Sequence, residues 1–393
     1  MTVMIATCLI GLAFGGVFKA FFELISFDAY SPTLLSASLL FLFAFVAPKP
    51  RLSRDGLWVI IALILFTLSY TFSFLYSPSS EYGPTKLIGV LGLIFCFTVG
   101  LMLPLKAGTA FLKIIPVFGV FVSIIFAGIM SSDLVALALF DFSGVGLIAG
   151  EIVGLGAIIL IYGSERPIVK LWGVSLCVFL MLYLGARGPA LFFIAIGSLI
   201  AIAAVPVSLR NVRHFSYPAL RSLVLTVVGV IIVASNIDWQ IILDATESGL
   251  SRFLMLFESD KGQSVSARVK MISDAIYHIE RSPVFGHGLG SYGLIVYGED
   301  FRAYPHNGFL EIWFESGVFG LLLFITFIAS AVTVGVKNCC YALSFAIIYL
   351  TLNFLKSSSL EELRILFLLC GMTCSYSFHN GGARHKRAYS SVN

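Results

Sequence analysis

Apolar stretches of membrane-spanning length recur along almost the whole sequence. A helix needs about 20 consecutive apolar residues to cross the hydrocarbon core of a bilayer. Only 12% of the 393 residues are charged, against about 25% in soluble domains. We place twelve apolar segments, at roughly 3–22, 33–47, 56–76, 86–104, 111–130, 144–162, 170–185, 189–207, 221–237, 308–334, 339–355 and 362–380. The sequence therefore predicts an all-α integral membrane protein with about 12 transmembrane helices, and residues 1–393 read as a single polytopic domain.

Basic residues gather on one side of these segments. If the N-terminus is cytoplasmic, the inner connections carry Lys49, Arg51, Arg54, Lys106, Lys113, Arg166, Lys170, Arg210, Arg213, Arg221, Lys337, Arg384, Lys386 and Arg387. The outer connections hold few basic residues beyond Arg187 and Lys356, with Lys86 and Arg364 near helix ends. This asymmetry is what the positive-inside rule describes. We therefore expect both termini to be cytoplasmic.

One long polar stretch, residues 238–305, interrupts the apolar pattern on the outer, periplasmic side. It is too rich in apolar and aromatic residues to be a disordered linker. Residues 264–283 within it indicate an amphipathic helix, with an apolar stripe formed by Val265, Val269, Ile272, Ile276 and Ile279. Arg268 lies about 60° from the centre of that stripe. We expect Arg268 to point toward the junction between this helix and the bilayer.

The motif GHGLGSYG, residues 286–293, contains the spacing G-x-G-x-x-G. A dinucleotide-binding fingerprint needs a preceding strand, a following helix and an acidic residue about 20 positions later. Here an amphipathic helix precedes the motif, so we reject that reading. We predict a tight glycine turn that reverses the chain, with a backbone amide nest facing an anion as the alternative.

Arg187, in LGARGPAL (184–191), lies between two apolar segments on the outer side. The short turn leaves it little room to move away from the membrane interface. An arginine at this depth snorkels to the headgroups, pairs with another group or binds a ligand. For a ligand, its guanidinium fork suits a phosphate.

The stretch AYPHNGFLEIWFESGVFG, residues 303–320, begins a hydrophobic helix with a histidine and two carboxylates. Asn307 is a plausible N-cap. Glu311 and Glu315 then lie one turn apart on one face. The helix dipole alone would favour these carboxylates near the N-terminus. A metal site from His306, Glu311 and Glu315 would need further ligands, of which His278 and His287 are the outer histidines. In a third reading, His306 is a base oriented by a carboxylate.

Topology alone places Arg187, Arg268 and His306 at the outer membrane interface, although they come from three distant parts of the chain. Two cations and a base at that level suit a substrate with an anionic lipid head and a transferable group. Nucleotide sugars and ATP are not available there, so the energy for a transfer must reside in a lipid-linked donor. We expect no cofactor and no nucleic-acid partner.

The motif G-x-G-x-G-S-Y, followed by P-H-N-x-x-L-E-x-x-x-E-x-G-x-x-G, extends from Gly286 to Gly320. This pattern resembles the bacterial O-antigen ligase and polymerase superfamily. The sequences ARG (186–188) and SAR (266–268) resemble that superfamily's two arginine motifs. The sequence departs from the superfamily at one point. A tryptophan usually follows the loop arginine there, whereas Met271 and Ile272 occupy that neighbourhood in this chain.

The resemblance implies a GT-C-like membrane glycosyltransferase of the bacterial inner membrane, metal-independent and inverting, with its active site facing the periplasm. The donor would be a glycan on undecaprenyl pyrophosphate. By the same resemblance Arg187 and Arg268 would bind the pyrophosphate, and His306 would activate the acceptor hydroxyl. We further expect Tyr304, Asn307, Glu311 and Glu315 to contact substrate, although the two carboxylates have the alternative of orienting His306.

Three readings of the function stay open. An O-antigen ligase would use lipid A core as acceptor, and an O-antigen or exopolysaccharide polymerase would use a lipid-linked repeat unit. A transporter or flippase of lipid-linked glycans is the rival from another class. Transporters tend to show inverted repeats and charged residues at the bilayer midplane, where Glu151, near Asp141, is the main candidate. A scaffold would leave Arg187, Arg268 and His306 without a joint purpose.

Overall fold

The computed structural model describes residues 2–14, 36–40, 54–130, 142–163, 167–184, 186, 188–197, 263–356 and 358–375. The regular elements within these ranges are helices, as predicted. The chain forms two compact units, one from residues 1–111 with 261–393 and the other from residues 112–260.

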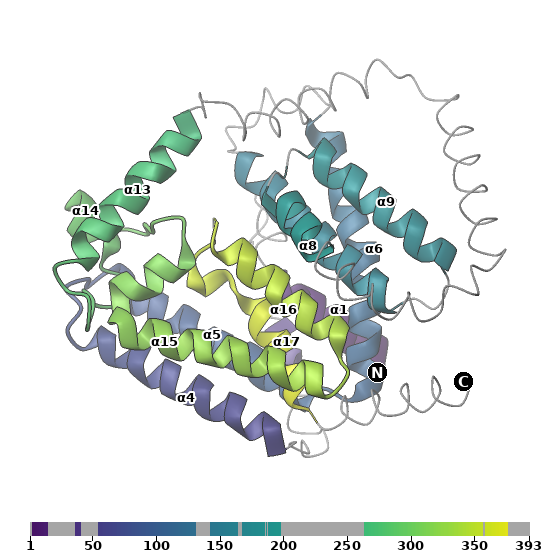
Figure 1. Ribbon diagram of the computed structural model, residues 1–393, viewed down its shortest axis with the longest axis horizontal. Coiled ribbons are helices and arrows are strands. Elements are labelled where there is room, and N and C mark those ends of the chain that lie inside the picture. Colours follow the sequence, from purple (N-terminus) through teal and green to yellow (C-terminus); the bar gives the residue numbers. More distant parts are fainter. Residues whose placement is uncertain are drawn as a thin grey trace, which may run out of the picture. The chain divides into compact units, whose positions relative to one another are not determined.

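The first unit is a bundle of long helices that is capped at one end by shorter ones (Figure 1). Its elements are α1 (Thr2–Ala13), α4 (Arg54–Phe74), α5 (Tyr82–Met102), α13 (Gln263–Ile279), α14 (Tyr292–Tyr297), α15 (Gly308–Lys337), α16 (Tyr341–Phe354), the 3-10 helix η2 (Leu360–Glu362) and α17 (Arg364–Cys374). Helix α4 packs along α15, and α5 packs along α17. Helix α16 contacts both α15 and α17 and so connects the two pairs.

Glycines allow α5 and α17 to pack with their backbones in contact. A Cβ atom added at Gly100 would lie 2.1 Å from the carbonyl oxygen of Leu368, and one at Gly371 would lie 2.0 Å from that of Phe97. Such close approach of small residues is a common way to pack helices in membranes, where burial of apolar surface from water does not drive association.

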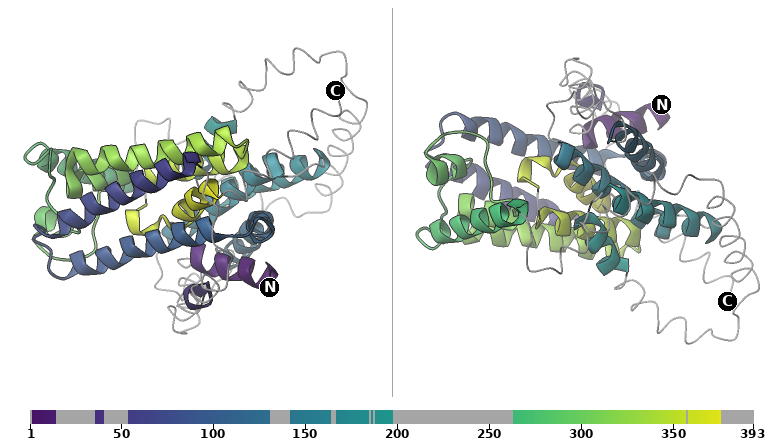
Figure 2. Two further views of the ribbon diagram at one scale, coloured as in Figure 1. Left: turned by 90° about the horizontal axis from the view of Figure 1, so that it is seen from below. Right: turned by 90° about the horizontal axis from the view of Figure 1, so that it is seen from above.

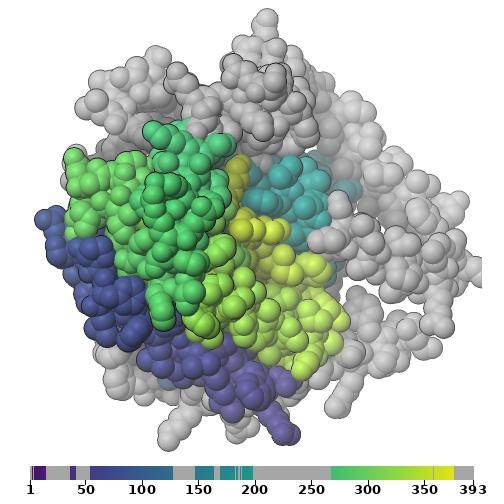
Figure 3. Space-filling view, turned by 60° about the vertical axis from the view of Figure 1, so that its left-hand side comes forward, coloured from purple at the N-terminus to yellow at the C-terminus, as the bar shows by residue number. Residues whose placement is uncertain are grey.

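At one end of this unit α4 ends and α5 and α15 begin. Helices α13 and α14 and the chain between them lie at this same end, as the two views of Figure 2 show. Figure 3 shows α13 on the surface, beside the segment that leads to α15. This end corresponds to the side that the charge pattern predicts to be periplasmic, and that orientation stays a prediction.

The second unit contains most of α6 (Leu105–Met130), together with α8 (Phe142–Gly163), α9 (Pro167–Tyr183) and a short helix at Gly188–Gly197. Helix α8 packs against α9. Helix α8 also lies close to α6, because a Cβ atom at Gly156 would lie 2.8 Å from the Cα of Pro116.

Four helices in the described part of the chain are long and apolar enough to cross a membrane: Arg54–Phe74, Tyr82–Met102, Leu105–Phe126 and Gly308–Lys337. Other predicted segments appear as shorter apolar helices, among them α16 with 14 residues and α17 with 11. The predicted segment 221–237 lies outside the described residues. The count of twelve transmembrane helices therefore stays a prediction.

Candidate functional site

Helix α15 begins where the sequence predicts. The side-chain oxygen of Asn307 accepts hydrogen bonds from the backbone amides of Phe309 and Leu310, both at 3.1 Å, and so caps the helix. His306, one residue earlier, has a φ of 53°. This left-handed conformation is uncommon for a residue with a side chain. The chain thus turns sharply at His306 before it enters α15.

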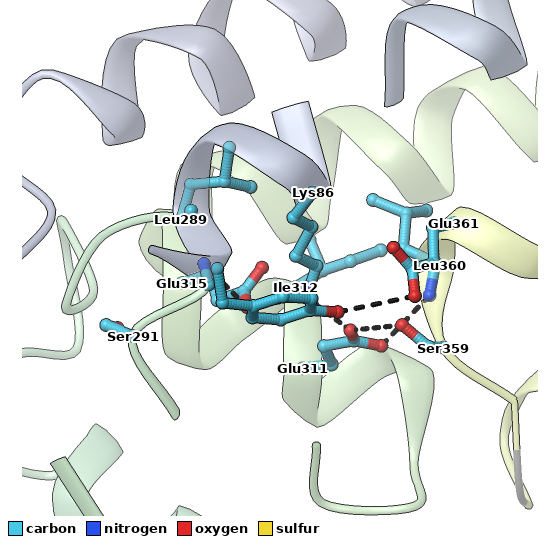
Figure 4. A network of polar contacts seen from close by, with 12 residues as sticks. Lys86, Leu289, Ser291, Glu311, Ile312, Glu315, Ser359, Leu360 and Glu361 are labelled. Carbon is cyan, nitrogen blue, oxygen red and sulfur yellow. Dashed lines mark hydrogen bonds and ion pairs between the residues drawn. The ribbon is translucent and has the colours of Figure 1, made fainter. Parts of the chain in front are cut away.

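Glu311 and Glu315 share one face of α15, as predicted, and both bind Lys86 on α5 (Figure 4). The ammonium lies 2.5 Å from Glu311 Oε1 and 2.6 Å from Glu315 Oε1. All three side chains are fully buried. A buried charge is tolerated where it is paired and hydrogen-bonded, and these three groups satisfy that condition together.

Each carboxylate also accepts two further hydrogen bonds from other parts of the chain. Glu315 accepts from the hydroxyl of Tyr70 on α4 and from the backbone amide of Gly290 at 3.0 Å. Glu311 accepts from Ser359 Oγ at 2.8 Å and from the Leu360 amide at 3.0 Å. The carboxylates therefore tie the first two turns of α15 to α4, α5, the glycine turn and η2. We call these two carboxylates with Lys86 the buried cluster.

The glycine motif forms the predicted tight turn. Gly286, Gly288 and Gly290 have φ values of 73°, 96° and 74°. A Cβ atom at Gly288 would lie 2.4 Å from the Cα of Ser77, so the turn packs directly on the connection between α4 and α5. The alternative is a nest of backbone amides that faces an anion. One amide of the turn, that of Gly290, does donate to an anionic group, but this group is the protein's own Glu315 carboxylate.

The side chain of His306 is poised for proton transfer. Its ring lies 4.6 Å from the ring of Tyr304, centroid to centroid. Its Nδ1 is buried and has no hydrogen-bond partner among the described residues. Burial and the positive charge of Arg268 lower the pKa of His306, and Glu311 opposes this effect. The imidazole is therefore neutral at neutral pH, so Nδ1 or Nε2 is free to accept a proton.

Arg268 lies on α13, which confirms the predicted amphipathic helix although α13 ends at Ile279 rather than at 283. The predicted apolar stripe is buried against the protein in part only. Ile279 is buried, together with Ala275, against Tyr292 and Phe314, but Val269 and Ile276 are 59% and 44% exposed. The apolar periodicity of the sequence predicts the helix. It does not predict which apolar side chains pack against the rest of the protein and which stay exposed.

Arg187 lies outside the described residues, so its predicted place beside His306 and Arg268 stays a prediction. The described residues contain no group of three or more His, Cys, Asp or Glu side chains arranged to hold a metal ion. Glu311 and Glu315, which the metal alternative required, instead bind Lys86.

Sequence reasoning missed Lys86 as a site residue. A signal was present, because Lys86 is the only charged residue in the apolar helix α5 and topology places it on the same side as Glu311 and Glu315. A charge within a membrane helix pairs with another group, so the partner was predictable in kind. Tyr70 and Ser359 carry no comparable signal in the sequence.

Comparison with known families adds independent evidence. Residues 152–325 match the family model described as O-antigen ligase. This match confirms the resemblance that the motifs indicate. It contains Arg187, Arg268, the glycine turn and His306. No curated protein matches the chain. Together with the apolar helices, the O-antigen ligase match indicates a bacterial membrane enzyme of the glycosyltransferase type.

Proposed function

We propose that this protein transfers a glycan from undecaprenyl pyrophosphate to an acceptor hydroxyl at the periplasmic face of the inner membrane, as an O-antigen ligase with lipid A core as acceptor. The observation that carries the proposal is the buried Nδ1 of His306, which has no hydrogen-bond partner among the described residues, in the electrostatic field of Arg268. A base next to a fixed cation is what transfer from a pyrophosphate requires. The family match supports the same class of reaction.

In the proposed reaction, His306 accepts the proton of the acceptor hydroxyl while that oxygen attacks the anomeric carbon of the donor sugar. The bond from this carbon to the pyrophosphate oxygen breaks, and undecaprenyl pyrophosphate leaves with the electron pair. Attack opposite to the leaving group inverts the anomeric configuration. Arg268 and Arg187 stabilise the charge on the pyrophosphate, and one such donor typically contributes about 10²–10³-fold in rate.

In the buried cluster, the carboxyl groups of Glu311 and Glu315 share the single ammonium of Lys86. Glu311 raises the pKa of His306, which favours the imidazolium formed when the acceptor proton is taken up. Both carboxylates are buried and hold three hydrogen-bonding partners each. We therefore assign them to holding α15 and tuning His306, and leave Tyr304 and Asn307 as the proposed substrate contacts.

The test uses purified protein with a lipid-linked glycan donor and, separately, lipid A core or a second lipid-linked repeat unit as acceptor. Transfer to lipid A core supports the ligase, and transfer only to the repeat unit makes the protein a polymerase. His306→Ala is expected to lose about 10²–10⁴-fold in rate, the usual contribution of a general base. Wild-type product levels from His306→Ala would overturn the catalytic assignment.

Two further measurements examine the groups around the leaving pyrophosphate. Arg187→Lys is expected to be severely impaired, because an ammonium lacks the planar fork that binds two phosphate oxygens. Full activity in that variant would mean that Arg187 only extends its charge to the lipid headgroups and does not bind the pyrophosphate. A chelator is expected to leave transfer unchanged, and inhibition that is reversed by one added metal ion would contradict the metal-independent mechanism.

A further inference from the structure

The backbone of His306 is held in a conformation that needs support from its surroundings. Its φ of 53° places a side-chain-bearing residue in the left-handed region. Such a residue is strained and keeps this conformation where neighbouring contacts fix the chain on both sides. On the C-terminal side, Asn307 caps α15. On the N-terminal side, two residues fix the chain at 299–305, which we call the anchored segment.

The first anchor is Asp300. Its carboxylate accepts hydrogen bonds from Ser79 Oγ at 2.7 Å, from the Glu81 amide at 2.8 Å and from the Tyr82 amide at 3.4 Å. Ser79 and Glu81 belong to the connection between α4 and α5, and Tyr82 is the first residue of α5. Asp300 therefore fixes the start of the anchored segment to the same helix ends that hold the buried cluster.

The second anchor is Arg302. Its Nε donates to Glu361 at 2.6 Å, and a terminal nitrogen donates to Glu362, also at 2.6 Å. Both glutamates belong to η2. The guanidinium also lies 5.7 Å from the centre of the Tyr304 ring, which in turn contacts the ring of His306. Arg302 thus joins η2 to the aromatic side chain that packs on the proposed base.

We infer that Asp300 and Arg302 are positioning residues that hold His306 in its left-handed conformation and orient its imidazole toward the acceptor. The inference rests on the proposed function, in which His306 is the base. The side chains of Arg302 and Glu362 are 48% and 46% exposed, and that of Glu361 is 17% exposed. Solvent-accessible ion pairs contribute little to folding stability, so a purely structural role of the Arg302 charge predicts only a small effect when that charge is removed. A positioning role predicts a loss of rate without a loss of fold.

The experiment compares Arg302→Gln with the double variant Glu361→Gln/Glu362→Gln, in full-length protein in detergent with the lipid-linked donor. We expect each to lower kcat by about 10²-fold, the usual effect of misplacing a catalytic group by about 1 Å. The KM for donor and the unfolding midpoint should stay near wild type. Combining the three substitutions should lower kcat no further than the double variant alone, because that variant already alters every contact of Arg302 with η2, together with the contacts of the two glutamates to the Tyr82 hydroxyl and the Ser359 amide. Asp300→Asn, which keeps one acceptor oxygen, should give an intermediate loss.

A matched control is Lys337→Gln, which removes the exposed 3.8 Å ion pair with Asp55. This pair lies where α15 ends and α4 begins, at the far end of these helices from His306. This control should keep the wild-type kcat. Three outcomes overturn the inference: unchanged kcat in the Arg302 and glutamate variants, a loss confined to Arg302→Gln, or a loss that only tracks the amount of folded protein. The second outcome would mean that Arg302 contacts substrate itself. If His306→Ala is fully active, the proposed function fails instead.

Discussion

Replacement of Lys86 by methionine gives the sharpest test of the buried cluster. Methionine approximates the length of the lysine stem, so the packing of α5 changes little while the ammonium disappears. Glu311 and Glu315 would each lose one of three hydrogen bonds. Two fully buried carboxylates would then face each other without a compensating charge.

The expected loss of stability is about 3–5 kcal/mol, the usual effect of removing one partner of a buried ion pair. The remaining donors, such as Ser359 Oγ and the Gly290 amide, cannot neutralise the second carboxylate. The triple variant Lys86→Met/Glu311→Gln/Glu315→Gln keeps an acceptor oxygen at each position and removes every charge. We expect it to be more stable than Lys86→Met alone, because a neutral amide is far less costly to bury than an unpaired charge.

The assay is unfolding in mixed detergent micelles, with Lys337→Met as control. Lys337 also belongs to an ion pair, but its side chain is 59% exposed. Exposed pairs contribute about 0–1 kcal/mol, so this control should unfold close to wild type. If Lys86→Met matched the Lys337→Met control, or if the triple variant were the less stable of the two Lys86 variants, the electrostatic account of the buried cluster would be wrong.

The rate of transfer should rise with pH through a pKa below the ordinary histidine value, because His306 must be neutral to act as a base and both burial and Arg268 lower its pKa. Arg268→Gln should raise the pKa of His306 and so move the acid limb of the residual activity to higher pH. An unchanged acid limb in the pH–rate profile would show that the charge of Arg268 does not act on His306. Gly288→Ala should lower the yield of folded protein in size-exclusion chromatography, because its Cβ would lie 2.4 Å from the Cα of Ser77, whereas Gly92→Ala, with open space around it on α5, is the tolerated control. Asn307→Ala should lower stability by about 0.5–2 kcal/mol in the micelle assay through loss of the helix cap, and an unchanged midpoint would contradict the importance of that cap.

Local features of the site were predictable from the sequence. Asn307 caps α15 as its residue type and position indicate. Glu311 and Glu315 share a face because a helix brings residues four apart together. Three of the four glycines in the 286–293 motif, Gly286, Gly288 and Gly290, have positive φ, which glycine adopts without steric penalty. Each of these predictions depends only on residues close in the chain.

Features that depend on distant residues were not predictable in the same way. The partner of Glu311 and Glu315 is Lys86, more than 220 positions earlier in the chain. Helical periodicity fixes which residues share a face but not which helix that face meets. The exposed Val269 on α13 shows the same limit. Charge pairing in an apolar environment is the one rule that reaches across the chain, and it restricts the partner to a cation at the same depth.

The extent of the family match has a structural consequence. Residues 152–325 contain the glycine turn, His306, Glu311 and Glu315, but they contain none of Lys86, Tyr70, Ser359 or Glu361. The matched region therefore carries two buried carboxylates whose compensating cation lies outside it, on α5. The anchored segment before His306 likewise depends on the α4–α5 connection and on η2. The motif residues need the flanking helices to reach their geometry, so the unit that must fold to build this site extends from α4 through η2.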